Sequence, residues 1–143
     1  MSNGRDIRRA AIQALFQFDC GADQSDDIVR ESLAGGAGDE TTQQEGYELA
    51  LQVWQRHEEA DVVISDLTPE WPTPRQPVID RNILRLGWFE IISERTPPKV
   101  VINEAVELAR EFSTDKSPLF VNGVLDKIYR NLREDVATTE TED

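Results

Sequence analysis

Cysteine, histidine and methionine are almost missing from this 143-residue chain, each occurring once. Cys20 alone excludes a disulfide framework and a cysteine metal cluster, and a single free cysteine fits a reducing compartment. No apolar run is long enough to cross a bilayer, and no apolar signal core follows the N-terminus. We therefore expect one cytoplasmic domain that needs no membrane, metal or other cofactor.

Motifs typical of enzymes are also missing. The sequence has no glycine-rich phosphate loop after a strand, no H-E-x-x-H and no C-x-x-C. The one histidine, His57, stands in a charged stretch and is expected to be a solvated surface residue. The neighbouring acids Glu58, Glu59 and Asp61 are typical of a solvated helix face rather than of an acid–base pair. The sequence therefore predicts a protein that is not an enzyme.

What the chain has in excess is negative charge. Its formal net charge is −13, from 28 acidic and 15 basic residues, and the acids crowd residues 19–61 and the C-terminal tail. A field of this sign repels phosphate and argues against indiscriminate nucleic-acid binding. A local basic cluster would still act, because charges beyond about 8 Å are largely screened at physiological salt. A basic partner protein and a small basic site on an acidic body both remain open.

Apolar residues recur at helical spacing through most of the chain, and no segment is convincing as a strand. Residues 68–77 hold four prolines and cannot continue a helix, so they are expected to connect two halves of one body. The residues from Val78 are apolar on more than one face, which is typical of a central helix. The expected helices cover about 6–19, 25–33, 42–67 with a possible break at 55–59, 78–95, and a helical hairpin within 97–132.

The predicted organisation is a single domain over residues 1–135. Its N-terminal half is residues 5–67 and its C-terminal half residues 78–133, whereas residues 136–143 have nothing to bury and are expected to be a disordered acidic tail. In the hairpin, Phe112 falls on the apolar face with Val101 and Leu108. Gly123, inside the last helix, is expected to allow close helix packing, since glycine there costs roughly 1 kcal/mol.

Two groups of residues could bind nucleic acid. Arg5, Arg8 and Arg9 share one side of the first helix and could follow a phosphate backbone, or could instead pair with the abundant acids. Phe16, if exposed beside them, offers a stacking surface for an unpaired base, although such a residue is more often core.

The second group lies in the turn before the last helix. Lys116 and Ser117 stand where amide groups and the helix dipole favour an anion. Phe120, one turn further, presents the same choice between stacking and burial.

Several segments together resemble one known family. The runs VINEAVELAREF and FVNGVLDK, the segment DRNILRLGWFEI and the opening RRAAIQALFQFD occur in the order found in the bacterial NusB family of transcription antitermination factors. The resemblance is strong over residues 78–132 and moderate over 5–20, and it covers the stretch between them only in helical layout.

The resemblance implies an all-α fold of two packed helical sub-bundles and no catalysis. It also implies binding to boxA-type single-stranded RNA of ribosomal RNA leaders, jointly with the ribosomal protein NusE, within the antitermination complex of RNA polymerase. The NusE-facing surface would use Asp80 and Arg85. The RNA surface would use Arg5, Arg8, Arg9, Phe16, Lys116, Ser117 and Phe120.

The arginine run is interrupted here by Gly4, Asp6 and Ile7, so we expect weak RNA binding alone and tighter binding with NusE. Two other functions remain open: a protein-binding adaptor without an RNA role, and the NusB-like RNA-binding domain of a 5-methylcytosine RNA methyltransferase. Members of the family occur as monomers and as dimers, so a homodimer is possible.

Overall fold

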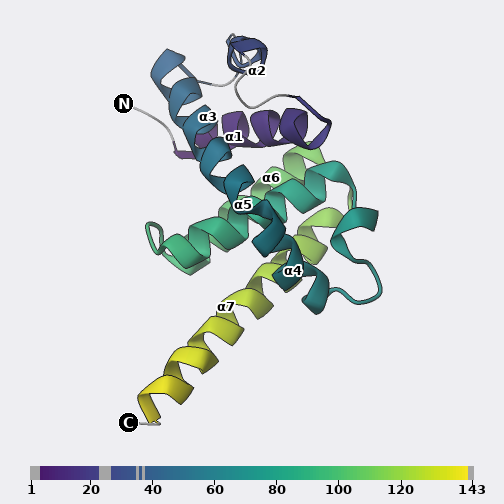
Figure 1. Cartoon of the computed structure of the whole chain (residues 1–143), viewed down its shortest axis with the longest axis vertical. Coiled ribbons are helices and arrows are strands. Elements are labelled where there is room, and N and C mark those ends of the chain that lie inside the picture. Colours follow the sequence, from purple (N-terminus) through teal and green to yellow (C-terminus); the bar gives the residue numbers. More distant parts are fainter. Residues whose placement is uncertain (1–3, 23–26, 35, 37, 142–143) are drawn as a thin grey trace.

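The computed structural model describes residues 4–22, 27–34, 36 and 38–141, with side chains up to residue 135 except that of residue 28. Within these residues every regular element is a helix, which confirms the predicted all-α class (Figure 1). In chain order the elements are α1 (Gly4–Asp19), α2 (Asp27–Ser32), α3 (Glu40–Gln55), α4 (His57–Leu67), the short 3-10 helix η1 (Thr73–Arg75), α5 (Val78–Ser93), α6 (Pro98–Phe112) and α7 (Ser117–Thr141).

Two helical groups meet at a central helix. In the first group α1 packs along α3, with α2 beside both, and in the second α6 packs along α7. Helix α5 contacts α1, α3 and α4 on one side and α6 and α7 on the other. Its apolar residues are buried nearly all round, among them Ile83, Leu84 and Trp88. The prediction of a central helix from residue 78 is therefore confirmed.

The predicted break in the helical stretch 42–67 is also present. Helix α3 ends at Gln55, and Arg56 leaves the helical region with φ −115° and ψ 13° before α4 begins at His57. His57 is not the solvated residue that we expected. Its ring stacks on Trp54 with 3.8 Å between centroids, and Nδ1 lies 2.5 Å from the Trp54 carbonyl oxygen. The break thus turns the chain so that α4 can reach α5 and α7.

The chain ends on a long helix. The last part of α7 projects from the body (Figure 1) and continues to Thr141, beyond the boundary at residue 133 that we expected. Residues 142 and 143, like residues 25 and 26 of the expected second helix, lie outside the described residues. Disorder of the acidic tail in solution stays a prediction. No helix in the described part of the chain has the length and apolar character needed to span a bilayer.

Candidate nucleic-acid interface

The three arginines of α1 are all held by carboxylates. Arg5 Nε lies 2.9 Å from Glu104, Arg8 Nε lies 3.0 Å from Glu90, and Arg9 bonds both Asp6 and Glu111. These acids, apart from Asp6, lie on α5 and α6, so the ion pairs fasten α1 to the central helix and to the second helical group. Of the two alternatives open at the sequence level, pairing with acids is the one that the structure shows.

These ion pairs differ in how far solvent reaches them. The Arg8 side chain is only 12% exposed, whereas that of Arg5 is 42% exposed. Exposed pairs contribute between about 0 and 1 kcal/mol because water and salt screen them. The Arg5 guanidinium is therefore more open to a phosphate than that of Arg8, although Glu104 is itself only 17% exposed.

The two glutamates are expected to respond to pH in opposite ways. Burial raises the pKa of Glu90 above its ordinary value, although the charge of Arg8 opposes this. The hydrogen bond from Arg5 lowers the pKa of Glu104. A carboxyl with a raised folded-state pKa favours folding at low pH and loses this contribution as pH rises through that pKa. A carboxyl with a lowered pKa stabilises above its unfolded pKa and loses the contribution as pH falls through the folded pKa.

The variants Glu90→Gln and Glu104→Gln should separate these effects. Relative to wild type, Glu90→Gln should gain stability as pH rises above about 4.5, the region in which an unfolded glutamate has already ionised. Glu104→Gln should instead lose stability relative to wild type as pH rises toward about 4.5 from below. Urea unfolding across this pH range measures both trends. Parallel trends in the two variants would contradict the assignment.

Phe16 lies at the surface, not in the core. Its side chain is 41% exposed and lines a groove of about 520 Å³ together with Ile12, Ile79 and Phe112. Phe112 was predicted to point inward, but it is also partly exposed, because α6 ends there and the groove opens beside it. Two exposed aromatic rings at one groove are unusual for a core face and suit stacking by a flat ligand.

The turn at residues 113–117 follows Phe112 directly, but only part of it faces solvent. Lys116 is exposed. Ser117 is buried and donates a hydrogen bond of 2.9 Å to Asp80, which also accepts one from Ser113. Direct contact between the Ser117 side chain and RNA, as we predicted, does not fit this arrangement, because its hydroxyl is used to hold the turn against α5.

Phe120 is half-buried and lies apart from the groove beside Phe16. Its ring packs against that of Trp71, with 5.0 Å between centroids and 56° between planes. The rest of its surface lines a second groove, formed by the proline-rich connector and α7. The structure therefore distributes the predicted aromatic residues over two grooves.

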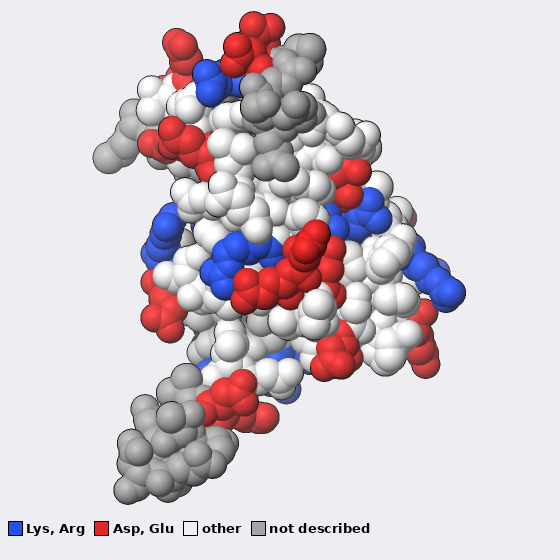
Figure 2. Space-filling view, in the orientation of Figure 1, with Lys and Arg blue, Asp and Glu red and all other residues white. Residues whose placement is uncertain are grey.

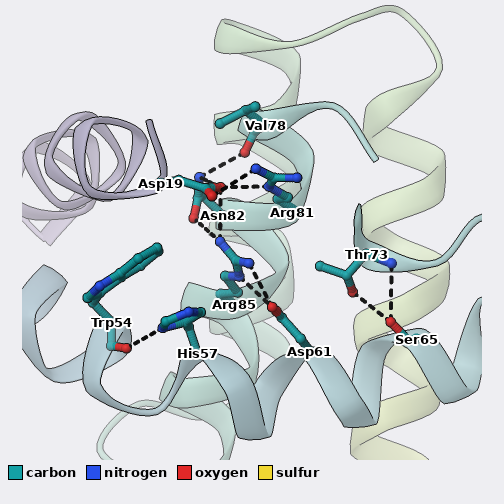
Figure 3. Close-up of polar contacts among 10 residues, drawn as sticks. All are labelled: Asp19, Trp54, His57, Asp61, Ser65, Thr73, Val78, Arg81, Asn82 and Arg85. Atoms are coloured by element: carbon teal, nitrogen blue, oxygen red, sulfur yellow. Dashed lines mark hydrogen bonds and ion pairs between the residues drawn. The ribbon is translucent and has the colours of Figure 1, made fainter. Parts of the chain in front are cut away.

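Arg85 belongs to a buried network that joins three helices (Figure 3). It donates to Asp61 of α4 at 2.8 and 2.7 Å, and to Asp19 at the end of α1 at 3.0 Å. Asp19 also accepts hydrogen bonds from Arg81 and Asn82.

Burial alone would raise the pKa of Asp19. The hydrogen bond from Arg81 and the charges of Arg85 and Arg81 outweigh this and lower it. Asp19 is therefore held as an anion by its neighbours.

The prediction that Asp80 and Arg85 face a partner protein needs correction. Asp80 is 1% exposed and Arg85 is 4% exposed, and both are occupied by bonds within the chain. Sequence pattern placed them on a helix without revealing that α4 and the turn at residues 113–117 cover it. Their contribution to any interface has to be indirect, through the position of the elements that they hold.

The surface carries no broad basic patch on the face seen in Figure 2. Lysine and arginine side chains lie beside acidic ones there, and red atoms outnumber blue at the upper end of the molecule. A contact with phosphate on this face would therefore involve a few cations within an acidic surrounding. Such a surface is expected to bind RNA with a shallow dependence on salt.

The fold and this site define a class of protein: an all-helical, two-group body whose first helix carries ion-paired arginines and an exposed aromatic side chain. The model of the NusB family matches residues 5–130. The transcription antitermination protein NusB of Chloroflexus aggregans is 38% identical over 142 residues, covering 94% of this chain and 92% of its own. That of a Roseiflexus species is 36% identical, covering 91% and 94%. The chain belongs to the NusB family, whose members named here are antitermination proteins, not enzymes.

Solved structures agree. NusB of T. maritima superposes with a TM-score of 0.74 at 31% identity, covering 91% of this chain and 93% of its own. A complex of the antitermination factors NusB and NusE with double-stranded RNA contains a chain with a TM-score of 0.75 at 25% identity, covering 89% and 96%. The predicted family and fold are thereby confirmed.

Proposed function

We propose that this protein is a transcription antitermination factor that binds boxA-type single-stranded RNA together with a NusE-type ribosomal protein, in the cytoplasm and within the antitermination complex of RNA polymerase. The observation that carries the proposal is the exposed Phe16 ring, which lies in a groove on the arginine-bearing helix α1. The relative solved with NusE and RNA supports the choice of partners.

In this proposal an aromatic ring makes the main contact with the RNA, and the cations add contacts with phosphate groups. An unpaired base stacks on Phe16, a contact worth about 1–3 kcal/mol. Arg5 exchanges its carboxylate partner Glu104 for a phosphate, and the exposed Lys116, in the turn that follows Phe112, provides a further cation. Arg8 and Arg9 hold α1 in place through their carboxylates. Because few phosphates are neutralised, RNA binding by the protein alone should be weak.

The basic partner supplies the positive charge that this acidic chain lacks. Ribosomal proteins are generally basic, and complementary charge speeds association and fixes orientation. Asp80 and Arg85 act here as positioning residues: Asp80 holds the turn that carries Lys116, and Arg85 holds α4 on α5. They are not expected to touch the partner.

The adaptor alternative has a specific observation in its favour, namely the arginines that are already paired. The methyltransferase alternative has none, since the relatives named above are antitermination proteins of matching length.

A fluorescence titration separates these functions. A labelled single-stranded boxA RNA is expected to bind the protein weakly alone and at least about tenfold more tightly when NusE is present. Phe16→Ala should then reduce affinity by about 5- to 150-fold, the range that corresponds to the loss of one stacked base. Gel filtration of the same mixtures reports whether the free protein is a monomer or a homodimer.

Val62→Ala provides the matched control, because Val62 is exposed on α4 and lines neither groove described above. It should bind RNA as the wild type does. If the wild type binds NusE but no RNA under any of these conditions, the adaptor function is the correct one.

A further inference from the structure

Helix α6 carries a row of three glutamates, two of which bond the arginines of α1. Glu104, Glu107 and Glu111 are three and four residues apart, so they share one side of α6 and form what we call the acidic row. Arg5 donates from Nε and Nη2 to the two carboxylate oxygens of Glu104, at 2.9 and 3.1 Å. Arg9 donates from Nε to both oxygens of Glu111, at 3.1 and 3.0 Å. Two arginines one turn apart on α1 therefore meet two acids two turns apart on α6.

The position of α1 does not depend mainly on α6. Helix α1 packs along α3 and against α5 through its buried residues. The enclosed ion pair between Arg8 and Glu90 joins α1 to α5 as well. The pair between Arg9 and Glu111 is more exposed than this one, and exposed ion pairs contribute little to stability. The acidic row is therefore not explained by the packing of α1 alone.

The acidic row gives the arginines the kind of partner that an RNA backbone would give them. Arginine binds carboxylate and phosphate alike through two parallel N–H···O bonds, and Arg5 makes this arrangement with Glu104. The hydrogen bond and the charge of Glu104 raise the pKa of Arg5, and the charges of Glu107 and Glu111 add to this effect. Arg5 is thus already surrounded by negative charge before any RNA arrives.

The acidic row also ends beside the groove at which a base is proposed to stack. Glu111 directly precedes Phe112, and Phe112 lines that groove together with Phe16. An RNA strand with one base on Phe16 would bring its phosphates close to Glu111, and like charges repel. The carboxylate has to separate from Arg9 before a phosphate can take its place.

We propose that the acidic row is an autoinhibitory contact: it occupies Arg5 and Arg9 in the free protein, and an RNA strand has to displace Glu104 and Glu111 in order to bind. The inference rests on the proposed function and names the regulation of the same site. It gives Arg9 a second use, because Arg9 holds α1 in the free protein and turns its Nε side to a phosphate in the complex. Asp6 keeps its bond to Arg9 Nη1 throughout.

The test removes one acid of the row. Glu111→Gln keeps the shape of the side chain but not its charge, so a phosphate can reach Arg9 Nε without displacing an anion. The affinity of the protein alone for the labelled boxA RNA should rise about two- to fivefold, the range that corresponds to one exposed ion pair. The dependence of log K on log salt should steepen by about 0.7, the value for one added phosphate contact with a single strand. The double variant with Glu104→Gln should gain more than Glu111→Gln alone.

Arg9 provides an independent readout. In the wild type, Arg9→Gln should change RNA affinity less than about twofold, because the phosphate contact that is lost and the ion pair that no longer has to be broken offset each other. In the Glu111→Gln background the same substitution should remove the gain in affinity. A gain that survives Arg9→Gln would contradict the displacement of Glu111 from Arg9.

Asp126→Asn is the matched control for net charge. Asp126 lies on α7, pairs with Arg130 and is 38% exposed, compared with 40% for Glu111. The substitution removes one negative charge without touching an arginine of α1, and should leave RNA affinity unchanged. An equal gain in Asp126→Asn and Glu111→Gln would show that net charge alone is responsible, and would overturn the inference.

The remaining outcomes separate this inference from the proposed function. Unchanged or lower RNA affinity in Glu111→Gln would overturn the autoinhibitory contact and assign Glu111 to holding α1 on α6. The proposed function would stand in that case, provided that the wild-type complex with NusE binds the RNA. Failure of the wild-type complex to bind RNA would overturn both.

Discussion

Replacing Arg85 by methionine is expected to lower the free energy of unfolding by about 3 kcal/mol. Removing one partner of a buried ion pair typically costs 3–5 kcal/mol, because the remaining charge stays buried without compensation. Here Asp61 loses both of its hydrogen bonds from Arg85, whereas Asp19 keeps those from Arg81 and Asn82. The bonds that Asp19 retains, and the 26% exposure of the Asp61 side chain, place the expected loss at the lower end of the range.

Urea unfolding of the wild type and of Arg85→Met at neutral pH measures this effect. Arg130→Met is the matched control, because its ion pair with Asp126 is exposed on both sides and should contribute no more than about 1 kcal/mol. Adding Asp61→Ala to Arg85→Met removes the unpaired carboxylate, so the double variant should recover part of the loss. A loss below about 1 kcal/mol in Arg85→Met would mean that the network does not hold α4 and α1 on α5.

The helices of this protein could be predicted from sequence because their apolar periodicity is local. The same periodicity identified α5 as central, since apolar residues on more than one face need neighbours on more than one side. The break near residue 56 was also visible as a polar interruption. The ends of the helices were harder to predict: α7 continues to Thr141, beyond the expected boundary at residue 133.

The site was harder to predict because its determinants are distant in sequence. Arg5 and Arg9 meet Glu104 and Glu111, which lie 99 and 102 positions away. No local pattern shows which acid an arginine will reach. A second difficulty is that polar residues on a helix are presumed to be exposed. Asp80 is buried under the turn at residues 113–117, and Arg85 is buried against α4 and the end of α1, and only the tertiary structure reveals these partners.

Aromatic exposure was the third difficulty. Phe16 and Phe112 both sit at positions that periodicity assigns to the core, yet both reach a groove at the end of their helices. Helix ends are where the apolar stripe runs past the neighbouring element, so burial there depends on what the partner helix covers. The sequence alone could not show that the rings of Phe16 and Phe112 are exposed at these positions.

Gly46 is the position where a single methyl group should do most harm. In α3 it faces α1, and an added Cβ would lie 2.5 Å from the Cβ of Ala10 and 2.7 Å from the carbonyl oxygen of Ile7. A backbone oxygen cannot rotate away as a side chain can, so the two helices would have to separate. Overpacking of this kind typically costs 1–3 kcal/mol.

We therefore expect Gly46→Ala to lower the free energy of unfolding by about 2 kcal/mol, from a steric cost of about 3 kcal/mol and a gain of about 1 kcal/mol in helix propensity. Gly123→Ala has the same propensity gain without the steric cost, and should raise stability by up to about 1 kcal/mol. A Cβ atom added there would meet nothing within 4 Å, so close helix packing, which we expected from the sequence, is not what this glycine provides.

Urea unfolding of both variants measures the change in the free energy of unfolding. A decrease in Gly46→Ala and an increase in Gly123→Ala would show that α1 and α3 require close contact, whereas α7 does not require its glycine. A gain in both variants would contradict the packing of α1 on α3, whereas a loss in both would contradict the open surroundings of Gly123.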